Sequence, residues 1–150
     1  MDYSFTYLST TLDQLPDAEQ QLCAKALEAS EGSYAPYSNY HVGAAIKLSD
    51  GTVVTGANQE NASYPCGTCA ERTALNYAQS AYPTLTVAAI AVAAKSSSRP
   101  ATKLPFPCGL CRQALLEAEQ RQNTPIKIIV ATSKEAMVFP SAACLLPFAF

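Results

Sequence analysis

Apolar positions recur at helical spacing in three segments of the chain. Between residues 16 and 31, Leu22, Ala26 and Ala29 fall on one helix face, and Pro16 suits a first turn that acidic residues follow. Residues 109–122 alternate in the same way between apolar and charged positions. The pattern predicts three helices, over residues 16–31, 69–79 and 109–122.

Shorter apolar runs between these helices are typical of strands. Residues 42–48 and 52–57 flank Asp50-Gly51, a dipeptide that favours a hairpin. Residues 87–93 are apolar throughout, which indicates a strand buried on both faces. Residues 95–107, rich in Ser, Pro and Arg, are expected to form a loop. The runs predict five strands, over residues 42–48, 52–57, 87–93, 125–130 and 137–139.

Strands separated by helices favour an α/β layered domain built on a mixed sheet. The chain has 150 residues, of which 49% are hydrophobic and 15% are charged, a composition typical of one compact domain. We therefore expect a single domain over residues 1–150, in which residues 1–15 form an N-terminal extension.

The charge pattern bears on the class of partner. The net charge is −2, and the ten Lys and Arg residues never form a run. A protein that binds nucleic acid usually clusters positive charge against phosphates, so a small neutral substrate is favoured and no nucleic-acid partner is expected. No signal-like N-terminus and no apolar segment of about 20 residues is present, which predicts no membrane partner and a cytoplasmic location.

The chemistry of the chain is concentrated in two cysteine motifs. Reduced cytoplasmic cysteines are most often metal ligands or buried thiols. Cys69-Ala70-Glu71 and Pro107-Cys108-Gly109-Leu110-Cys111 each lie where a loop enters a predicted helix, and helix N-termini favour thiolate over thiol. Three thiolates leave one position of a tetrahedral zinc ion open for water, and a carboxylate two residues from a ligand can carry a proton.

The cysteine motifs also allow other interpretations. Cys66-x-x-Cys69 and Cys108-x-x-Cys111 together match a closed, structural four-thiolate zinc site. The long gap between the two pairs and the presence of Glu71 count against that site, which leaves Cys66 as a neighbour. A redox pair would explain neither the second motif nor the carboxylate. His41 lies at a predicted strand start and is interpreted as a bystander.

The chain resembles the cytidine deaminase family, and specifically its small, three-cysteine, tetrameric type. The signature of a ligand-x-Glu followed by Pro-Cys-x-x-Cys is that of zinc deaminases. The resemblance continues in the family's order through residues 34–45, 56–65, 69–74, 107–113 and 145–150.

The resemblance implies a catalytic role for each motif residue. Cys69, Cys108 and Cys111 would bind one zinc ion per chain. Glu71 would take a proton from the attacking water, protonate ring nitrogen N3 and later deliver a proton to the departing ammonia. Arg72 would donate to the ligand sulfurs and so withdraw charge from three thiolates around the zinc.

The family also implies substrate contacts at Tyr40, Asn58, Glu60, Tyr64, Ala70 and Phe150. Asn58 and Glu60 would bind the ribose hydroxyls, and the backbone N–H of Ala70 would meet the base. Tyr40 would pack against the ring at a position where the family has phenylalanine. Phe150 would reach the pocket of a neighbouring subunit.

The implied protein is a three-layer domain with a mixed five-stranded sheet and helices on both faces. It would form a homotetramer whose neighbouring subunits complete each site, and it would convert cytidine and deoxycytidine to uridine and deoxyuridine in pyrimidine salvage. Two alternatives stay open. One is a deaminase that acts on a base within RNA or DNA, or on a nucleoside antibiotic. The other is a non-enzymatic, zinc-stabilised binding module that would hold its ion with Cys66.

Overall fold

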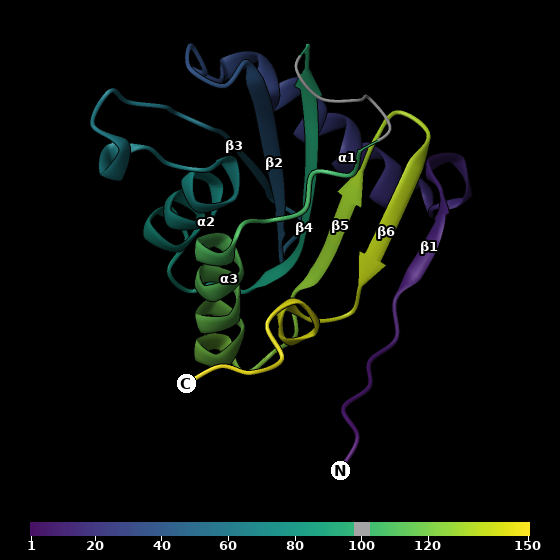
Figure 1. The fold of residues 1–150 in the computed structure, drawn as a ribbon. Coiled ribbons are helices and arrows are strands. Elements are labelled where there is room, and N and C mark those ends of the chain that lie inside the picture. The colour runs from purple at the N-terminus through teal and green to yellow at the C-terminus, as the bar shows by residue number, and fades with distance from the viewer. Residues whose placement is uncertain (98–102) are drawn as a thin grey trace.

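The computed structural model describes residues 1–97 and 103–150 as one sheet with helices on both sides (Figure 1). The three predicted helices are confirmed; the boundaries of the first two differ by one or two residues from the prediction, and those of the third agree with it. They are α1 at Asp17–Ala29, α2 at Ala70–Ala81 and α3 at Gly109–Gln122. The strands are β1 at Leu8–Thr11, β2 at Tyr40–Leu48, β3 at Val53–Ala57, β4 at Val87–Ser96, β5 at Lys127–Ala131 and β6 at Glu135–Phe139.

The prediction of five strands is wrong, because within the described residues the sheet has six, in the order β1-β6-β5-β4-β2-β3. Strand β1 comes from the segment predicted as an N-terminal extension, and it pairs antiparallel with β6, Leu8 opposite Val138. Its sequence Leu8-Ser9-Thr10-Thr11 is mostly polar, so no apolar run announces it. Backbone pairing at an open sheet edge, rather than burial of side chains, places it there.

The sheet is mixed, as predicted, since β4 and β5 run parallel and β4 lies antiparallel to β2. Strand β4 is longer than expected because it follows the full length of β2, and Lys95 and Ser96 pair with His41 and Tyr40. These two residues were predicted to begin a loop. Of the remainder of that predicted loop, residues 98–102 lie outside the described residues.

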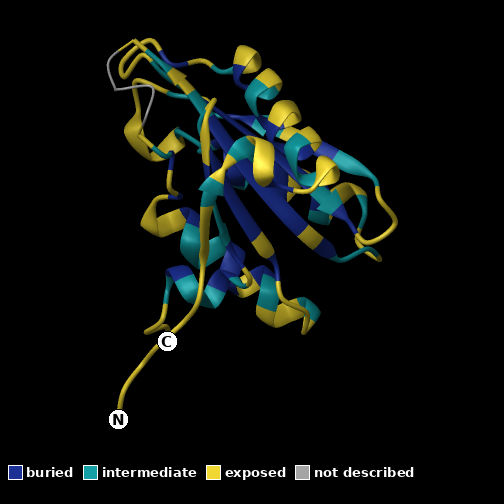
Figure 2. Cartoon of the chain, turned by 90° about the vertical axis from the view of Figure 1, so that its right-hand side faces the viewer, coloured by how far each residue is buried: buried dark blue, intermediate teal, exposed yellow. Residues whose placement is uncertain are grey.

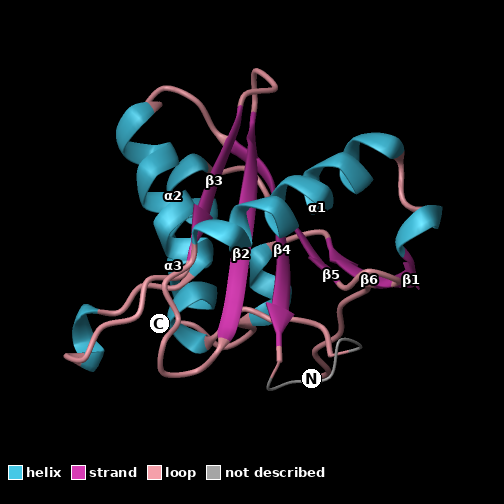
Figure 3. Cartoon of the chain, turned by 90° about the horizontal axis from the view of Figure 1, so that it is seen from above, coloured by secondary structure: helices cyan, strands magenta, loops and turns pink. Residues whose placement is uncertain are grey.

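Helices cover both faces of the sheet, as Figure 3 shows from above. Along β2, Ala44 and Ile46 belong to the apolar core shared with α2 and α3, whereas Ala45 belongs to the core beneath α1. Successive strand residues point to opposite faces, so one strand contributes to both cores. The central strands are accordingly the most deeply buried part of the chain (Figure 2). The predicted three-layer α/β fold is confirmed.

Two glycines let the helices approach the sheet closely. A Cβ on Gly43 would lie 1.8 Å from the carbonyl oxygen of Ala26 in α1, and one on Gly56 would lie 2.5 Å from the backbone nitrogen of Ala74 in α2. Real Cβ atoms do not come this near to backbone, so only glycine fits at either position. Gly56 therefore fixes the depth at which α2 lies on the sheet.

Buried polar contacts hold α3 and the C-terminal segment in place. The Glu119 carboxylate accepts hydrogen bonds from the backbone N–H of Ile126 and of Ala142, each at 2.7 Å, and from the Ser141 hydroxyl at 2.6 Å.

No helix among residues 1–97 and 103–150 combines the length and the apolar character that crossing a membrane requires.

Candidate active site

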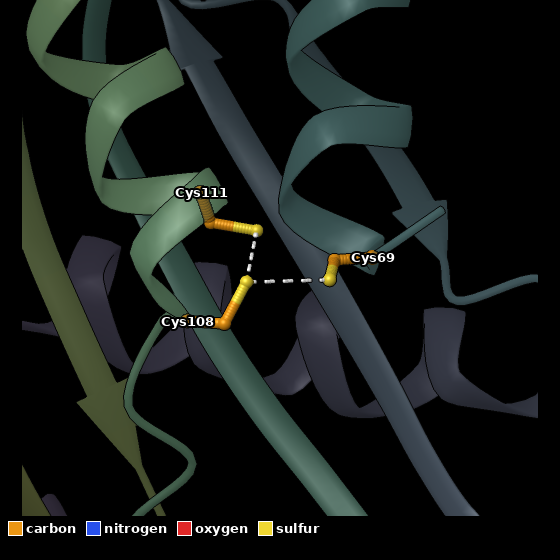
Figure 4. Close-up of side chains that lie close together, drawn as sticks. All are labelled: Cys69, Cys108 and Cys111. Carbon is orange, nitrogen blue, oxygen red and sulfur yellow. Dashed lines mark hydrogen bonds between the residues drawn. The ribbon is translucent and has the colours of Figure 1, made fainter. Parts of the chain in front are cut away.

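Three cysteine sulfurs meet where α2 and α3 begin (Figure 4). Cys69 is the N-cap residue of α2, Cys108 is the N-cap residue of α3, and Cys111 lies in the first turn of α3. The Sγ atom of Cys108 lies 3.6 Å from that of Cys69 and 3.6 Å from that of Cys111. All three sulfurs fall within 4.8 Å of one another. The predicted convergence of the two motifs is confirmed.

This geometry fits a zinc ion. Zn–S bonds of about 2.3 Å in a tetrahedral site separate the sulfurs by about 3.8 Å, close to the distances in the chain. The separations are too long for a disulfide, whose sulfurs lie about 2 Å apart. Hydrogen bonding from Cys111 lowers the pKa of the Cys69 thiol to about 5, and the same contact raises the pKa of Cys111. Thiolate is therefore favoured at Cys69, and a metal needs its thiol ligands deprotonated.

Cys66 does not join this group. It lies in a 3-10 turn at Tyr64–Cys66 and is exposed. Among the described residues, the group of side chains close enough to share an ion contains Cys69, Cys108 and Cys111 and no fourth member. The closed four-thiolate arrangement is thus not formed.

Glu71 is the charged side chain that the fold buries beside the thiols. It is 5% exposed, and helix α2 places it two residues after Cys69. Burial raises the pKa of the Glu71 carboxyl to about 7, and the Cys69 thiolate adds to this rise, while hydrogen bonding within the site acts in the opposite direction. The Cys69 and Cys111 thiols both act on the pKa of Glu71, which shows that the carboxyl group lies beside the thiol cluster.

Arg72 follows Glu71 in the first turn of α2. Its Nη2 atom is 3.5 Å from the carbonyl oxygen of Gly67, and its Nε is buried without a hydrogen-bond partner in the described part of the chain. Burial alone would lower the pKa of the Arg72 guanidinium, but hydrogen bonds to Cys69 and Cys111 hold it above its ordinary value. The Arg72 guanidinium and the Cys69 thiolate therefore stabilise each other's charged forms.

A cavity of about 470 Å³ opens onto the cluster. Its lining includes nine of the residues predicted for the site, namely Tyr40, Asn58, Glu60, Tyr64, Cys69, Ala70, Glu71, Arg72 and Cys108. Cys111 is fully buried behind this wall. Phe150 is fully exposed at the C-terminus and is not among the lining residues of the described chain.

Asn58 binds the backbone at the start of β2, and Glu60 binds the loop that precedes this strand. Asn58 accepts a hydrogen bond from the backbone N–H of Val42 and donates one to the carbonyl oxygen of Tyr40, both at 2.8 Å. Glu60 accepts hydrogen bonds from the backbone N–H of Tyr37, at 2.9 Å, and from the Ser38 hydroxyl. The Ser38 hydroxyl and the backbone N–H groups of Tyr37 and Ser38 keep the pKa of the Glu60 carboxyl below its usual range. Glu60 is thus ionised at the cavity wall.

Aromatic residues form much of the remaining wall. Tyr64 is largely exposed and packs edge-on against Tyr37, with ring centroids 6.4 Å apart. Tyr40 packs against the core that lies under α2 and α3. His41 is hydrogen-bonded through Nδ1 to the Ser33 hydroxyl at 2.6 Å and does not line the cavity, in agreement with its interpretation as a bystander.

Sequence reasoning missed two features of the site. Phe106 and Leu110 line the cavity beside Cys108, and their position within two residues of a ligand was the available signal. Arg112 donates from Nε to the carbonyl oxygen of Pro107 at 2.9 Å and from Nη1 to that of Leu145 at 3.2 Å, so it ties the cysteine loop to the C-terminal segment. A basic residue in the middle of a motif gave no hint of this structural contact.

Comparison with known proteins agrees with this site. The family model described as the cytidine and deoxycytidylate deaminase zinc-binding region matches residues 16–125, which contain all three thiols. The chain is 50% identical over 99 residues to a cytidine deaminase of Halalkalibacterium halodurans, covering 65% of this chain and 70% of the relative. It is 37% identical over 131 residues to a cytidine deaminase of Sporosarcina psychrophila, covering 87% of this chain and 90% of the relative.

The fold agrees as well. The crystal structure of a cytidine deaminase from Burkholderia pseudomallei superposes with a TM-score of 0.72 at 38% identity, covering 87% of this chain and 97% of the other. A matched zinc-binding region and three sulfurs at tetrahedral spacing identify the cluster as a zinc site. On the strength of its site, its fold and these relatives, the chain belongs to the cytidine deaminase family.

Proposed function

We propose that the chain catalyses the hydrolytic deamination of cytidine and deoxycytidine to uridine and deoxyuridine. The observation that carries the proposal is a buried carboxyl group, that of Glu71, beside a three-thiol zinc site at one wall of a cavity. In the reaction the oxygen of water forms a bond to C4 of the pyrimidine, the bond from C4 to the exocyclic nitrogen breaks, and that nitrogen leaves as ammonia.

Glu71 moves the protons in this scheme. Zn²⁺, when held by the three sulfurs, lowers the pKa of water and so supplies a nucleophile near neutral pH. Glu71 takes the first proton that the attacking water loses and passes it to ring nitrogen N3, then takes the second proton from the same oxygen and delivers it to the departing nitrogen. Burial keeps the carboxyl group away from bulk water, so that protons pass between it and the substrate. Arg72 offsets the excess negative charge of three thiolates.

The other lining residues bind and orient the nucleoside. Asn58 and Glu60 bind the sugar hydroxyls, and Glu60 keeps lone pairs free for this, since a carboxylate has about four acceptor positions. The backbone N–H of Ala70, the first residue of α2, has no acceptor within its helix and is directed to the base. Tyr40 and Tyr64 pack against the pyrimidine.

A free nucleoside is a better substrate for this site than a base within RNA or DNA. A cavity of about 470 Å³ falls in the range that holds small molecules. The chain has a net charge of −2 and no run of basic residues that would follow a phosphate backbone.

The proposal extends to a cytoplasmic homotetramer that serves pyrimidine salvage, in which Phe150 of one subunit reaches the pocket of the next.

The absorbance of cytidine during incubation with purified protein tests the activity. Cytidine should lose absorbance as uridine forms, one ammonia should appear for each uridine, and a zinc chelator should abolish both changes. Single-stranded oligonucleotides containing cytosine serve as the parallel substrate and should release no ammonia. Release from the oligonucleotides alone would favour a nucleic-acid deaminase, and a lack of turnover with zinc bound would favour a binding module.

A further inference from the structure

Three aromatic rings connect the N-terminal segment to the wall of the cavity. Tyr7, directly before β1, stacks on Phe139 at the end of β6, with ring centroids 5.8 Å apart and planes inclined by 28°. Phe106 meets Phe139 edge-on, with centroids 6.2 Å apart at 67°. Phe106 in turn lines the cavity, two residues before the zinc ligand Cys108.

The burial of the three rings shows which one is fixed and which depend on it. Phe139 is 4% exposed within the core, whereas Tyr7 is 54% and Phe106 is 43% exposed. The position of Phe106 is therefore not set by deep burial of its own ring. Its ring instead meets Phe139, and Tyr7 stacks on that same ring, so the two exposed rings share one buried partner.

Strand β1 holds Tyr7 in this arrangement. Four residues of β1 pair with β6, from Leu8 opposite Val138 to Thr11 opposite Glu135 (Figure 1). Pairing of the two backbones brings the residue before β1 alongside the residue at the end of β6. Tyr7 and Phe139 both lie outside the region that matches the zinc-binding family model, residues 16–125, while Phe106 lies inside it.

We propose that Phe106 is a substrate-contacting residue of the cavity wall and that Tyr7, acting through Phe139, is its positioning residue. The inference rests on the proposed function, since the ligand is the flat pyrimidine nucleoside of that reaction. A ring held at the wall offers an apolar surface to the nucleoside in the ground state and in the transition state alike. Loss of the contact therefore weakens binding without removing any proton-transfer group, which raises KM and leaves kcat little changed.

The test compares single and double variants of the full-length chain in the cytidine assay. Tyr7→Leu should raise KM by about 2- to 10-fold, the factor expected for one aromatic pair, with kcat and zinc content retained. Tyr7→Phe, which keeps the ring, should behave like the unmodified chain. Phe106→Leu should raise KM by at least as much as Tyr7→Leu. The double variant should be no worse than Phe106→Leu alone, because the effect of Tyr7 passes through Phe106.

Tyr77→Leu is the matched control. Tyr77 is 55% exposed and packs edge-on against Tyr82 at 6.5 Å, but it does not line the cavity. A KM for Tyr7→Leu equal to that of Tyr77→Leu, or additive effects in the double variant, would overturn the inference while leaving the proposed function intact. Failure of the unmodified chain to deaminate cytidine would instead overturn the proposed function. Thermal melting verifies folding, and Tyr7→Met takes the place of Tyr7→Leu if that variant unfolds.

Discussion

At the scale of single residues, Glu71 is a carboxyl group kept from water yet adjacent to three thiols. We expect Glu71→Gln to keep the fold and one zinc per chain while kcat falls by about 10²- to 10⁴-fold, because an amide cannot carry the proton. Initial rates and metal analysis on the same preparation measure this. Glu117→Gln, an exposed change on α3, is the control. Ammonia release at the unmodified rate would contradict the role of Glu71.

Replacement by serine should affect bound zinc differently at Cys111 and at Cys66. Cys111→Ser should lose most of its bound zinc, because the fully buried Cys111 supplies one of three converging sulfurs. Cys66→Ser should keep one zinc per chain, since Cys66 lies outside the cluster. Zinc content after gel filtration decides the matter, and loss of zinc from both variants would restore the four-thiolate interpretation.

Residue-scale prediction from the sequence worked where chemistry dictates residue type. Thiols at fixed spacing on helix starts indicate a zinc site, so the convergence of Cys69, Cys108 and Cys111 could be predicted without coordinates. Phe106 was missed, although it lies two residues before Cys108, because an apolar residue between two prolines looks like an ordinary loop residue. Its partner Phe139 is distant in sequence, and only the folded sheet brings the two rings together.

At the scale of secondary-structure elements, the packing of α2 against β3 controls the geometry of the site. A Cβ added at Gly56 would lie 2.5 Å from the backbone nitrogen of Ala74 and 2.9 Å from the carbonyl oxygen of Ala70, so Gly56→Ala must push α2 outward. We expect a loss of about 1–3 kcal/mol in the free energy of unfolding, measured with urea. Catalytic activity should also fall, because α2 has Cys69 and Glu71 at its start.

Gly32→Ala provides the comparison for this change, because a Cβ at Gly32 meets no atom within 4 Å. Equal stability of the two alanine variants would mean that the helix does not depend on the close approach.

The elements themselves were predictable to the extent that side-chain burial creates a pattern. Helices α1, α2 and α3 and the central strands have one clear apolar period each, and all were found. Strand β1 was not, because three of its four residues are polar and most are exposed, so its position depends on backbone pairing alone. The end of β4 was missed for a related reason, since Lys95 and Ser96 are held by pairing with β2 rather than by burial.

At the scale of the whole molecule, the fully exposed Phe150 bears on assembly. If Phe150 enters a neighbouring pocket in a homotetramer, Phe150→Ala should raise KM by several-fold through the lost aromatic contact. Coexpression of Phe150→Ala chains with Glu71→Gln chains should restore some sites that have both an intact carboxylate and an intact neighbour. Light scattering should report the mass of four chains, and a monomer with unmodified activity would contradict the arrangement.

The pairing of β1 with β6 also has a consequence for solubility. Without β1, the outer edge of β6 would present a row of unsatisfied amide and carbonyl groups, which is a template on which strands of other molecules can assemble. The edge that β1 presents instead is short and polar, two features that limit pairing with other molecules, so the N-terminal residues act as a guard against aggregation. Shortening the chain at this end would risk precipitation even where every residue of the zinc centre is retained.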